Sequence, residues 1–290
     1  MFVAQITDLH LGFDPGVPDE FNQQRFERAL AALVDLPQRP ELLLVTGDIA
    51  DNGEDVEVYR RYRRTIDELP FPVYSALGNH DVRAGFFAVF PEIAPDDGFL
   101  QYVIEHLPLR IVVLDTLEEG RHGGAFCRRR AAWLQARLDE APDRPTLVAL
   151  HHPPIDTGIP WLTEDPGAPW VAQLRHAVEG RRNIVGLIAG HVHRPIVAGW
   201  AGFPLMVCPS TAPQVALSLE PIDPDMPDDR PMIIADPPCY ALHRWDGSQL
   251  VSHFNTAEEH QVLARYTPKL QPLVRMLIQE KEGSTLLELP

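Results

Sequence analysis

Short apolar runs that end in aspartate, asparagine or histidine constrain the fold of this chain more than any other feature. Six runs have the composition of buried strands, at residues 2–7, 41–46, 71–77, 109–116, 146–150 and 184–189. Longer amphipathic or charged stretches lie between them, at about 21–36, 55–69, 127–140 and 168–180, and predict helices. This alternation predicts an α/β protein whose sheet is covered by helices on its faces.

The polar residues stand where these runs end. The motifs are Asp8-Leu9-His10, Gly47-Asp48, Gly78-Asn79-His80-Asp81, His151-His152 and Gly190-His191-Val192-His193. Alternate side chains of an extended segment point to the same side, so His191 and His193 are expected to face one small volume or two neighbouring points. Sites in α/β sheets gather beyond the carboxyl ends of the strands, so we expect the five motifs to converge.

Each motif alone has an ordinary structural explanation. An isolated H-x-H is more often a pair of surface or hydrogen-bonded histidines than a metal site, and Asp8 or Asp48 is also compatible with a helix cap. His152 is compatible with a satisfied histidine of the core. The coincidence of all five motifs at strand ends, with six of the twelve histidines among them, is the stronger signal.

The residue types in these motifs indicate a metal centre. Carboxylates, imidazoles and one amide form a nitrogen and oxygen donor set without thiolates, which suits Mn, Fe, Zn or Co. The candidate ligands are Asp8, His10, Asp48, Asn79, His151, His191 and His193. Seven candidates exceed the three or four that one catalytic ion takes, so we expect two divalent or trivalent ions with Asp48 as the bridge. Two ions ~3.5–4 Å apart can promote an in-line displacement at phosphorus.

The order of the motifs over residues 1–193 resembles that of the calcineurin-like metallophosphoesterase superfamily. The resemblance implies a four-layer sandwich of two mixed β-sheets flanked by helices, with a dinuclear centre. By position, one ion takes Asp8, His10, Asp48 and His193, and the other takes Asp48, Asn79, His151 and His191. The resemblance also makes His80 a catalytic residue that binds no metal: it stabilises the transition state or protonates the leaving oxygen, with Asn79 beside the developing charge.

Departures from the superfamily's pattern reduce the number of its branches that this chain resembles. The stretch "GDIADNG" has Asp51 and Asn52 where serine/threonine protein phosphatases carry an arginine, and Asp51 also stands where purple acid phosphatases have a tyrosine ligand. The remaining similarity is to bacterial class III cyclic-nucleotide and glycerophosphodiester phosphodiesterases, and it continues through 209–217 and 239–245. Pro213 stands where we expect a histidine in the glycerophosphodiesterase-like members, so a glycerol contact there is not expected.

The resemblance therefore implies a metal-dependent hydrolase of small phosphodiesters, of the 3',5'-cyclic nucleotide or glycerophosphodiester type. A metal-bound hydroxide is expected to attack phosphorus. Two alternatives stay open at this point: a phosphomonoesterase or protein phosphatase on the same fold, and a non-catalytic metal-bound scaffold.

The bulk charge excludes some classes of partner. With 25 basic and 41 acidic side chains the formal net charge is −16, which disfavours nucleic-acid polymers and anionic membranes. No stretch approaches the ~20 apolar residues of a membrane span, and the N-terminus reads as a strand rather than a signal peptide. We expect a cytoplasmic protein.

The last third differs in composition from the rest. We expect a phosphoesterase core over residues 1–212 and a C-terminal extension over 213–290. The extension contains a proline-rich acidic loop at 213–238, a hairpin around Asp246-Gly247, and a helix with one apolar stripe. We expect it to act as a lid or a subunit contact, and members of this branch form oligomers, so a homodimer or higher homo-oligomer is expected.

Overall fold

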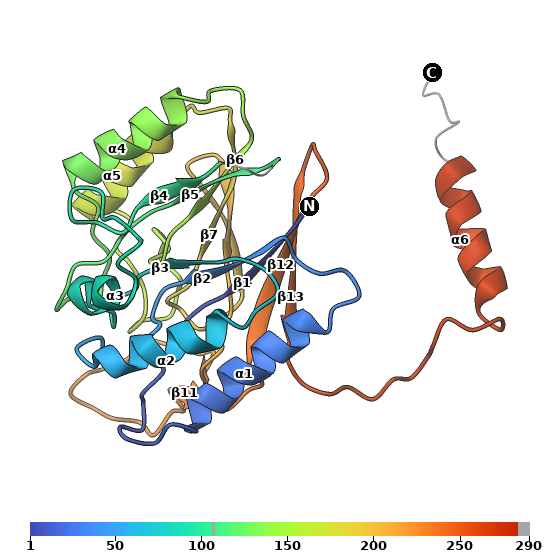
Figure 1. The fold of residues 1–290 in the computed structure, drawn as a ribbon, viewed down its shortest axis with the longest axis horizontal. Helices are drawn as coiled ribbons and strands as arrows, with labels where there is room; N and C mark the ends of the chain where they lie inside the picture. Colours follow the sequence, from blue (N-terminus) through green and yellow to red (C-terminus); the bar gives the residue numbers. More distant parts are fainter. Residues whose placement is uncertain (106–107, 284–290) are drawn as a thin grey trace. The chain divides into compact units, whose positions relative to one another are not determined.

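The computed structural model describes residues 1–105 and 108–283. The chain divides into two compact units, Met1–Glu258 and Glu259–Pro290. The first unit holds both large sheets and helices α1 to α5 (Figure 1). The first unit therefore includes residues 213–258 of the predicted C-terminal extension.

The first sheet combines strands from both ends of the first unit. Its order is β13-β12-β1-β2-β3, with the strands β1 (Phe2–Ile6), β2 (Leu42–Thr46), β3 (Val73–Ala76), β12 (Cys239–Trp245) and β13 (Leu250–Thr256). Strands β1, β2 and β3 are parallel, whereas β12 runs antiparallel to β1 and to β13. The predicted hairpin around Asp246 thus exists, and it completes the sheet of the N-terminal strands.

The second sheet has the order β4-β5-β6-β7-β9-β8. Its strands are β4 (Tyr102–Ile104), β5 (Arg110–Val113), β6 (Thr146–Ala149), β7 (Ile184–Ala189), β8 (Ile196–Trp200) and β9 (Phe203–Val207). The four central strands β5, β6, β7 and β9 are parallel, and the edge strands β4 and β8 are antiparallel to their neighbours. Both sheets are therefore mixed, as predicted.

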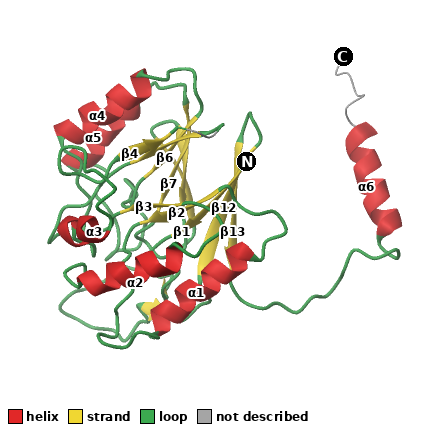
Figure 2. Cartoon of the chain, viewed as in Figure 1, coloured by secondary structure: helices red, strands yellow, loops and turns green. Residues whose placement is uncertain are grey.

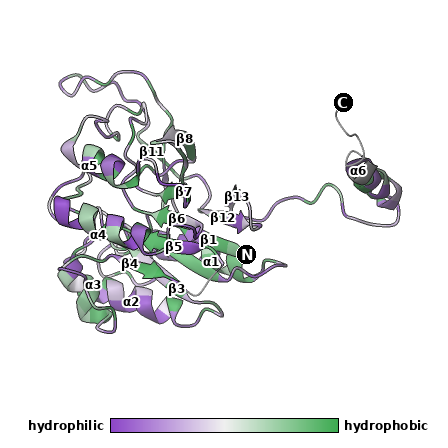
Figure 3. Ribbon diagram, turned by 90° about the horizontal axis from the view of Figure 1, so that it is seen from above, coloured by the Kyte–Doolittle hydropathy of each residue, from purple (hydrophilic) through white to green (hydrophobic). Residues whose placement is uncertain are grey.

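Helices cover the outer faces of the two sheets (Figure 2). Three of them, α1 (Phe21–Val34), α2 (Val56–Ile66) and α3 (Arg83–Val89), pack on the first sheet, and α4 (Arg128–Asp139) and α5 (Pro169–Val178) pack on the second. In Figure 3 strands β3 and β4 are hydrophobic, while α4 and α5 carry both hydrophobic and hydrophilic stretches, as expected for helices with one buried side.

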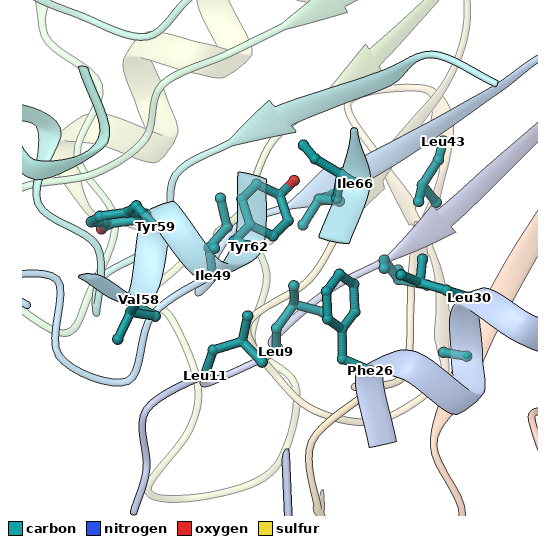
Figure 4. Close-up of a cluster of buried hydrophobic side chains, with 14 of the residues drawn as sticks. Leu9, Leu11, Phe26, Leu30, Leu43, Ile49, Val58, Tyr59, Tyr62 and Ile66 are labelled. Carbon is teal, nitrogen blue, oxygen red and sulfur yellow. The ribbon is translucent and has the colours of Figure 1, made fainter. Parts of the chain in front are cut away.

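The alternation of side chains along each strand builds the layers. On β2, Leu43 lies in one apolar cluster with Phe26 and Tyr62 of helices α1 and α2 (Figure 4). Val45, two residues along β2, belongs to the same cluster. Their neighbours Leu42 and Leu44 face the other way and join a cluster shared with the second sheet. Because strand side chains alternate, each strand contributes to two apolar layers. The predicted four-layer sandwich is confirmed.

Several short elements were not predicted. Helix α3 has seven residues, and β4, β8 and β9 have three to five. Within the proline-rich region 213–238, two-residue strands β10 (Gln214–Val215) and β11 (Ile233–Ile234) pair antiparallel. Such elements are too short to show a period in the sequence, and pairing with a neighbour forms them.

The second unit contains helix α6 (Gln271–Gly283), which corresponds to the predicted apolar stripe. Leu273, Met276, Leu277 and Ile278 on this helix are each 46–53% exposed. Residues 284–290 of the predicted extension lie outside the described residues. Within the part of the chain that the structure describes, no helix combines the length and the apolar composition that a membrane crossing requires.

Candidate metal centre

The five polar motifs meet at the carboxyl ends of strands from both sheets. Asp8 and His10 follow β1, Asp48 follows β2, and Asn79 and His80 follow β3 of the first sheet. His151 follows β6, and His191 and His193 follow β7 of the second sheet. The convergence predicted from the sequence is present, and it spans the junction between the two sheets.

One carboxylate lies between two groups of nitrogen and oxygen atoms. Asp48 Oδ2 is 3.6 Å from His10 Nε2 and 3.4 Å from His151 Nε2. On the first side, His10 Nε2 is 3.1 Å from His193 Nε2, which is 3.5 Å from Asp8 Oδ1.

On the other side of Asp48, the amide of Asn79 faces the second sheet. Asn79 Oδ1 lies 3.3 Å from His151 Nε2. The spacing of these donor atoms suits two ions that share Asp48.

His191 groups with two other histidines, His151 and His152. Its ring centroid is 5.2 Å from that of His151 and 4.7 Å from that of His152, and the three imidazoles form a group that could hold an ion. Nδ1 of His191 is buried and has no hydrogen-bond partner among the described residues. A buried polar atom without a partner is costly, and coordination of an ion would satisfy it.

The predicted ligand set does not include His152. Its Nδ1 is 2.8 Å from Thr116 Oγ1, whereas its Nε2 is buried without a partner in the described chain. Burial, followed by the neighbouring His151, holds the pKa of His152 well below its usual range. His152 is therefore a neutral histidine packed against the cluster.

Hydrogen bonds to carbonyl groups fix which ring nitrogen faces the centre. Nδ1 of His151 donates to the carbonyl of Thr46 at 2.7 Å, and Nδ1 of His193 donates to the carbonyl of Pro213 at 2.8 Å. A carbonyl only accepts, so the proton resides on Nδ1 and a neutral ring keeps its lone pair on Nε2. Metal-binding histidines are held in the same way, and the residues present therefore fit a metal pair.

The backbone around the centre is conformationally unusual. Among the described residues, eight other than glycine have positive φ, and five of them belong to the cluster. These are Asp8 (53°), His10 (46°), Asp48 (49°), His191 (74°) and His193 (54°). Left-handed conformations are costly for such residues and concentrate at functional sites, where the surrounding structure enforces them.

Two glycines leave room for the carboxylates. A Cβ on Gly78 would lie 2.2 Å from Asp48 Oδ1, and one on Gly190 would lie 3.0 Å from Asp8 Oδ2 and 2.0 Å from Thr7 Oγ1. The distances from a Cβ on Gly78 to Asp48 Oδ1 and from a Cβ on Gly190 to Thr7 Oγ1 are far below van der Waals contact. The glycines in the G-N-H-D and G-H-x-H motifs are thus required by close approach of the ligand side chains.

Asp81 connects the loops that carry the ligands. Its buried carboxylate accepts hydrogen bonds from the backbone amides of Ile49, Ala50 and Gly78 at 2.9–3.2 Å, and from Tyr59 Oη at 3.0 Å. Burial, and then the charge of Asp48, raise the pKa of Asp81 to about 6. The last residue of the G-N-H-D motif therefore holds the loops after β2 and β3 together.

Charges within the cluster are strongly coupled. Burial opposes the charged form of His151, but the charge of Asp48 and its hydrogen bond outweigh this and raise the pKa of His151 to about 9. Burial also opposes ionisation of Asp48, yet His151, His10 and His80 hold its pKa well below the usual range. A proton on His151 thus occupies the place of a positive ion beside Asp48.

Two adjoining cavities open over the centre. One of about 170 Å³ is bordered by Trp161 and Leu162, and one of about 330 Å³ by Phe13 and Phe21. Both are also lined by His10, His80, His193 and Ile233, and no lysine or arginine is among the described residues that line them. The space beside the cluster is therefore apolar on its outer sides and contains no fixed cation.

One histidine at the site was missed from the sequence. His122 is in none of the five motifs, yet its Nδ1 is 3.1 Å from Asn79 Nδ2 and it lines the smaller cavity. Burial lowers its pKa. The run at 109–116 ends several residues before His122, so the signal that identified the other histidines was absent.

Comparison with known proteins gives the family. Residues 1–195 match the calcineurin-like phosphoesterase family. The chain is 30% identical over 260 residues to a probable glycerophosphodiester phosphodiesterase of Arcobacter nitrofigilis, covering 87% of this chain and 92% of that protein. It is 35% identical over 229 residues to a probable cyclic nucleotide phosphodiesterase of Rhodopseudomonas palustris, covering 75% and 77%.

Solved structures share the fold at much lower identity. A dimetal phosphatase from Danio rerio superposes with a TM-score of 0.64 at 13% identity, over 89% of this chain and 97% of that one. Plasmodium GAP50, described as the anchor in the inner membrane complex, superposes with a TM-score of 0.60 at 12% identity, over 96% and 94%. With the family match and the Asp and His clusters, these findings make the chain a metallophosphoesterase of the calcineurin-like phosphoesterase family, related to cyclic nucleotide and glycerophosphodiester phosphodiesterases.

Proposed function

We propose that this protein hydrolyses small phosphodiesters with the help of two transition-metal ions. The observation that carries the proposal is the position of Asp48, whose Oδ2 lies 3.6 Å from His10 Nε2 and 3.4 Å from His151 Nε2. Asp8, His10, Asp48 and His193 would hold one ion, and Asp48, Asn79, His151 and His191 the other. The mixed nitrogen and oxygen donors suit Mn, Fe, Zn or Co.

In the proposed centre the bound ions would supply charge, and the residues around the ligands would fix the orientation of the ligands. When bound, two such ions supply positive charge for the phosphoryl oxygens and for the attacking water. Thr46 and Pro213 fix the rings of His151 and His193 through their carbonyls. The fixed rings keep the donor atoms in place, so little reorganisation is required during the reaction.

His80 is the proposed acid for the leaving oxygen. Its Nδ1 is 2.8 Å from the carbonyl of Asp51, and its ring lines both cavities. When both ring nitrogens are protonated, His80 keeps the bond to Asp51 and presents Nε2–H to the cavity. A proton delivered from this position neutralises the alkoxide as the ester bond breaks.

The cavity walls favour a singly charged substrate with an apolar or planar alcohol group. No cation among the described lining residues would balance a second negative charge, and Phe13, Phe21 and Ile233 offer an apolar surface beside the cluster. Pro213 lines the same cavity and cannot supply the side-chain hydrogen bond of a histidine to a glycerol hydroxyl. These features favour a cyclic nucleotide type of diester over a glycerophosphodiester.

The first experiment compares bis(p-nitrophenyl) phosphate with p-nitrophenyl phosphate. Chelated protein would be assayed before and after reconstitution with Mn, Co, Zn or Fe. Diester hydrolysis that disappears on chelation and returns with metal is expected. A preference for the monoester would instead indicate a phosphatase, and bound metal without turnover of either ester would indicate a scaffold.

Residues 213–238 are proposed to act as a lid on the site. Pro213, Val215 and Ile233 from this region line the cavities over the cluster. Deletion of 213–238 should therefore change the ratio of kcat/KM between diesters with large and small alcohol groups. If this kcat/KM ratio were unchanged in a folded deletion variant, the proposed lid would be contradicted.

A further inference from the structure

His122 occupies a position beside the cluster that its place in the sequence does not indicate. It lies on the segment between β5 and α4, which belongs to the second sheet's side of the site. Its Nδ1 is 3.1 Å from Nδ2 of Asn79, and its ring centroid is 4.8 Å from that of His191. His122 therefore contacts the side chains of two candidate ligands of the same ion.

The orientation of the Asn79 amide gives His122 a defined role. Asn79 Oδ1 faces the cluster, 3.3 Å from His151 Nε2, so Nδ2 faces away from it and toward His122. An amide nitrogen only donates, so Nδ1 of His122 must accept and the proton of its neutral ring is on Nε2.

Without such a partner the amide has two similar orientations. The terminal torsion of asparagine is broad and roughly two-fold, and rotation would exchange the oxygen and the nitrogen. A rotated amide would turn a hydrogen-bond donor toward a metal ion and its oxygen toward the lone pair of His122. When the proton of His122 is on Nε2, the lone pair on Nδ1 therefore favours the one orientation in which Asn79 can bind metal.

We propose that His122 is a positioning residue that holds the Asn79 amide with Oδ1 directed at the second ion. The inference rests on the proposed dimetal site. Loss of a hydrogen bond that orients a ligand typically costs ~10–100-fold in metal affinity. The expected effect is therefore a weaker second ion, with the first ion bound as in the unaltered protein.

Replacing His122 with asparagine or with glutamine tests whether this residue positions the Asn79 amide or has another role. In His122→Asn the side-chain oxygen can occupy roughly the place of imidazole Nδ1, whereas in His122→Gln the amide reaches roughly the place of Nε2. His122→Ala removes both groups, and His176→Ala removes an exposed histidine of α5 as the matched control. Each chelated variant would be titrated with Mn²⁺ by calorimetry, and its thermal unfolding would be followed to verify folding.

The second Mn²⁺ should bind ~10–100-fold more weakly to His122→Ala and His122→Gln, and close to normally to His122→Asn and His176→Ala. Hydrolysis of bis(p-nitrophenyl) phosphate at limiting Mn²⁺ should follow the same order, and saturating Mn²⁺ should restore most of it. Equal affinities in Asn and Gln variants, or two normal ions in His122→Ala, would overturn the inference. A different result would contradict the proposed function: an unaltered protein that binds fewer than two ions or hydrolyses no diester.

Discussion

At the scale of single residues, the centre depends on histidines whose neighbours decide which ring nitrogen carries the proton. His80, like His151 and His193, has its Nδ1 beside a backbone carbonyl, that of Asp51 at 2.8 Å, and its ring borders both cavities. His80 also forms a group of possible ligands with His10 and Asp48, whose donor atoms lie within 4.8 Å of one another. We propose that His80 serves in proton transfer rather than in metal binding, as its place in the G-N-H-D motif implies.

His80→Ala should keep both ions and lower kcat for a diester with an alkyl leaving group by ~10²–10⁴, as expected for a lost acid. The loss should be smaller for bis(p-nitrophenyl) phosphate, because p-nitrophenolate needs little protonation. Metal content by elemental analysis and rates for both esters would test this. Release of metal from the variant, or an equal loss for the two leaving groups, would contradict the role.

The ion pair between Asp48 and His151 makes a prediction about pH. Burial opposes the charge on His151, but Asp48 raises its pKa to about 9, above the value of 6.5 expected for the unfolded chain. The folded, chelated protein therefore holds an extra proton between these pH values. Its contribution to stability, on the order of 3 kcal/mol, is complete below pH 6.5 and is lost as the pH rises toward 9.

The melting temperature of chelated protein should accordingly fall between pH 6.5 and 9, and His151→Gln should flatten this dependence. Metal must replace the proton on His151, so the affinity for Mn²⁺ should rise over the same interval. Calorimetric melts and metal titrations at several pH values would measure both. A chelated protein that gains stability toward pH 9 would contradict the assignment.

At the scale of elements, the turn after each strand sets the position of the ligands. Gly78 follows β3, and a Cβ there would lie 2.2 Å from Asp48 Oδ1 and 2.6 Å from Asp48 N and from His151 Cε1. Backbone atoms among these neighbours cannot rotate away. The position of Asp48, the proposed bridge, therefore depends on the absence of a side chain in the loop after β3.

Gly78→Ala should displace Asp48 and His151, and turnover should fall more than about 100-fold together with metal affinity. Gly199→Ala on β8 is the control, because a Cβ at that position meets nothing within 4 Å. Metal titration and circular dichroism of both variants would test the prediction. Two normally bound ions in Gly78→Ala would show that the loop can adjust.

At the scale of the whole molecule, the two compact units have different surfaces. The first unit buries its apolar clusters between and outside two sheets, whereas α6 leaves Leu273, Met276, Leu277 and Ile278 about half exposed. Water contact of a continuous apolar stripe is unfavourable, and such stripes commonly mark subunit contacts. We propose that α6 contributes to a homo-oligomer.

The combined substitutions Leu273→Glu and Leu277→Glu should lower the molecular mass measured by light scattering to that of a monomer. Leu263→Glu, at a residue 86% exposed and outside α6, should leave the mass unchanged. Hydrolysis of bis(p-nitrophenyl) phosphate should survive in both, because the cluster lies in the first unit. An unaltered assembly in the double variant would exclude α6 as the contact.

Much of this architecture was predictable because it depends on local order along the chain. Buried strands, helices and the turn residues between them have short periods in sequence, so the runs ending at Thr7, Thr46 and Ala189 were identified with the polar motif that follows each. Parallel strands bring their carboxyl ends to one edge, which makes convergence of those motifs a consequence of topology. The donor types then limit the chemistry to a metal centre of nitrogen and oxygen ligands.

Only the tertiary structure decided which distant side chains touch. His122 lies 43 residues from Asn79, and His10 lies 183 residues from His193, so neither contact has a local signature. Strands β12 and β13 extend the N-terminal sheet because β12 pairs with β1, which no period within residues 239–256 reveals. The sequence determined the elements and the candidate ligands, whereas the packing of the two sheets determined the distances between them, because those distances depend on how all the layers fit together at once.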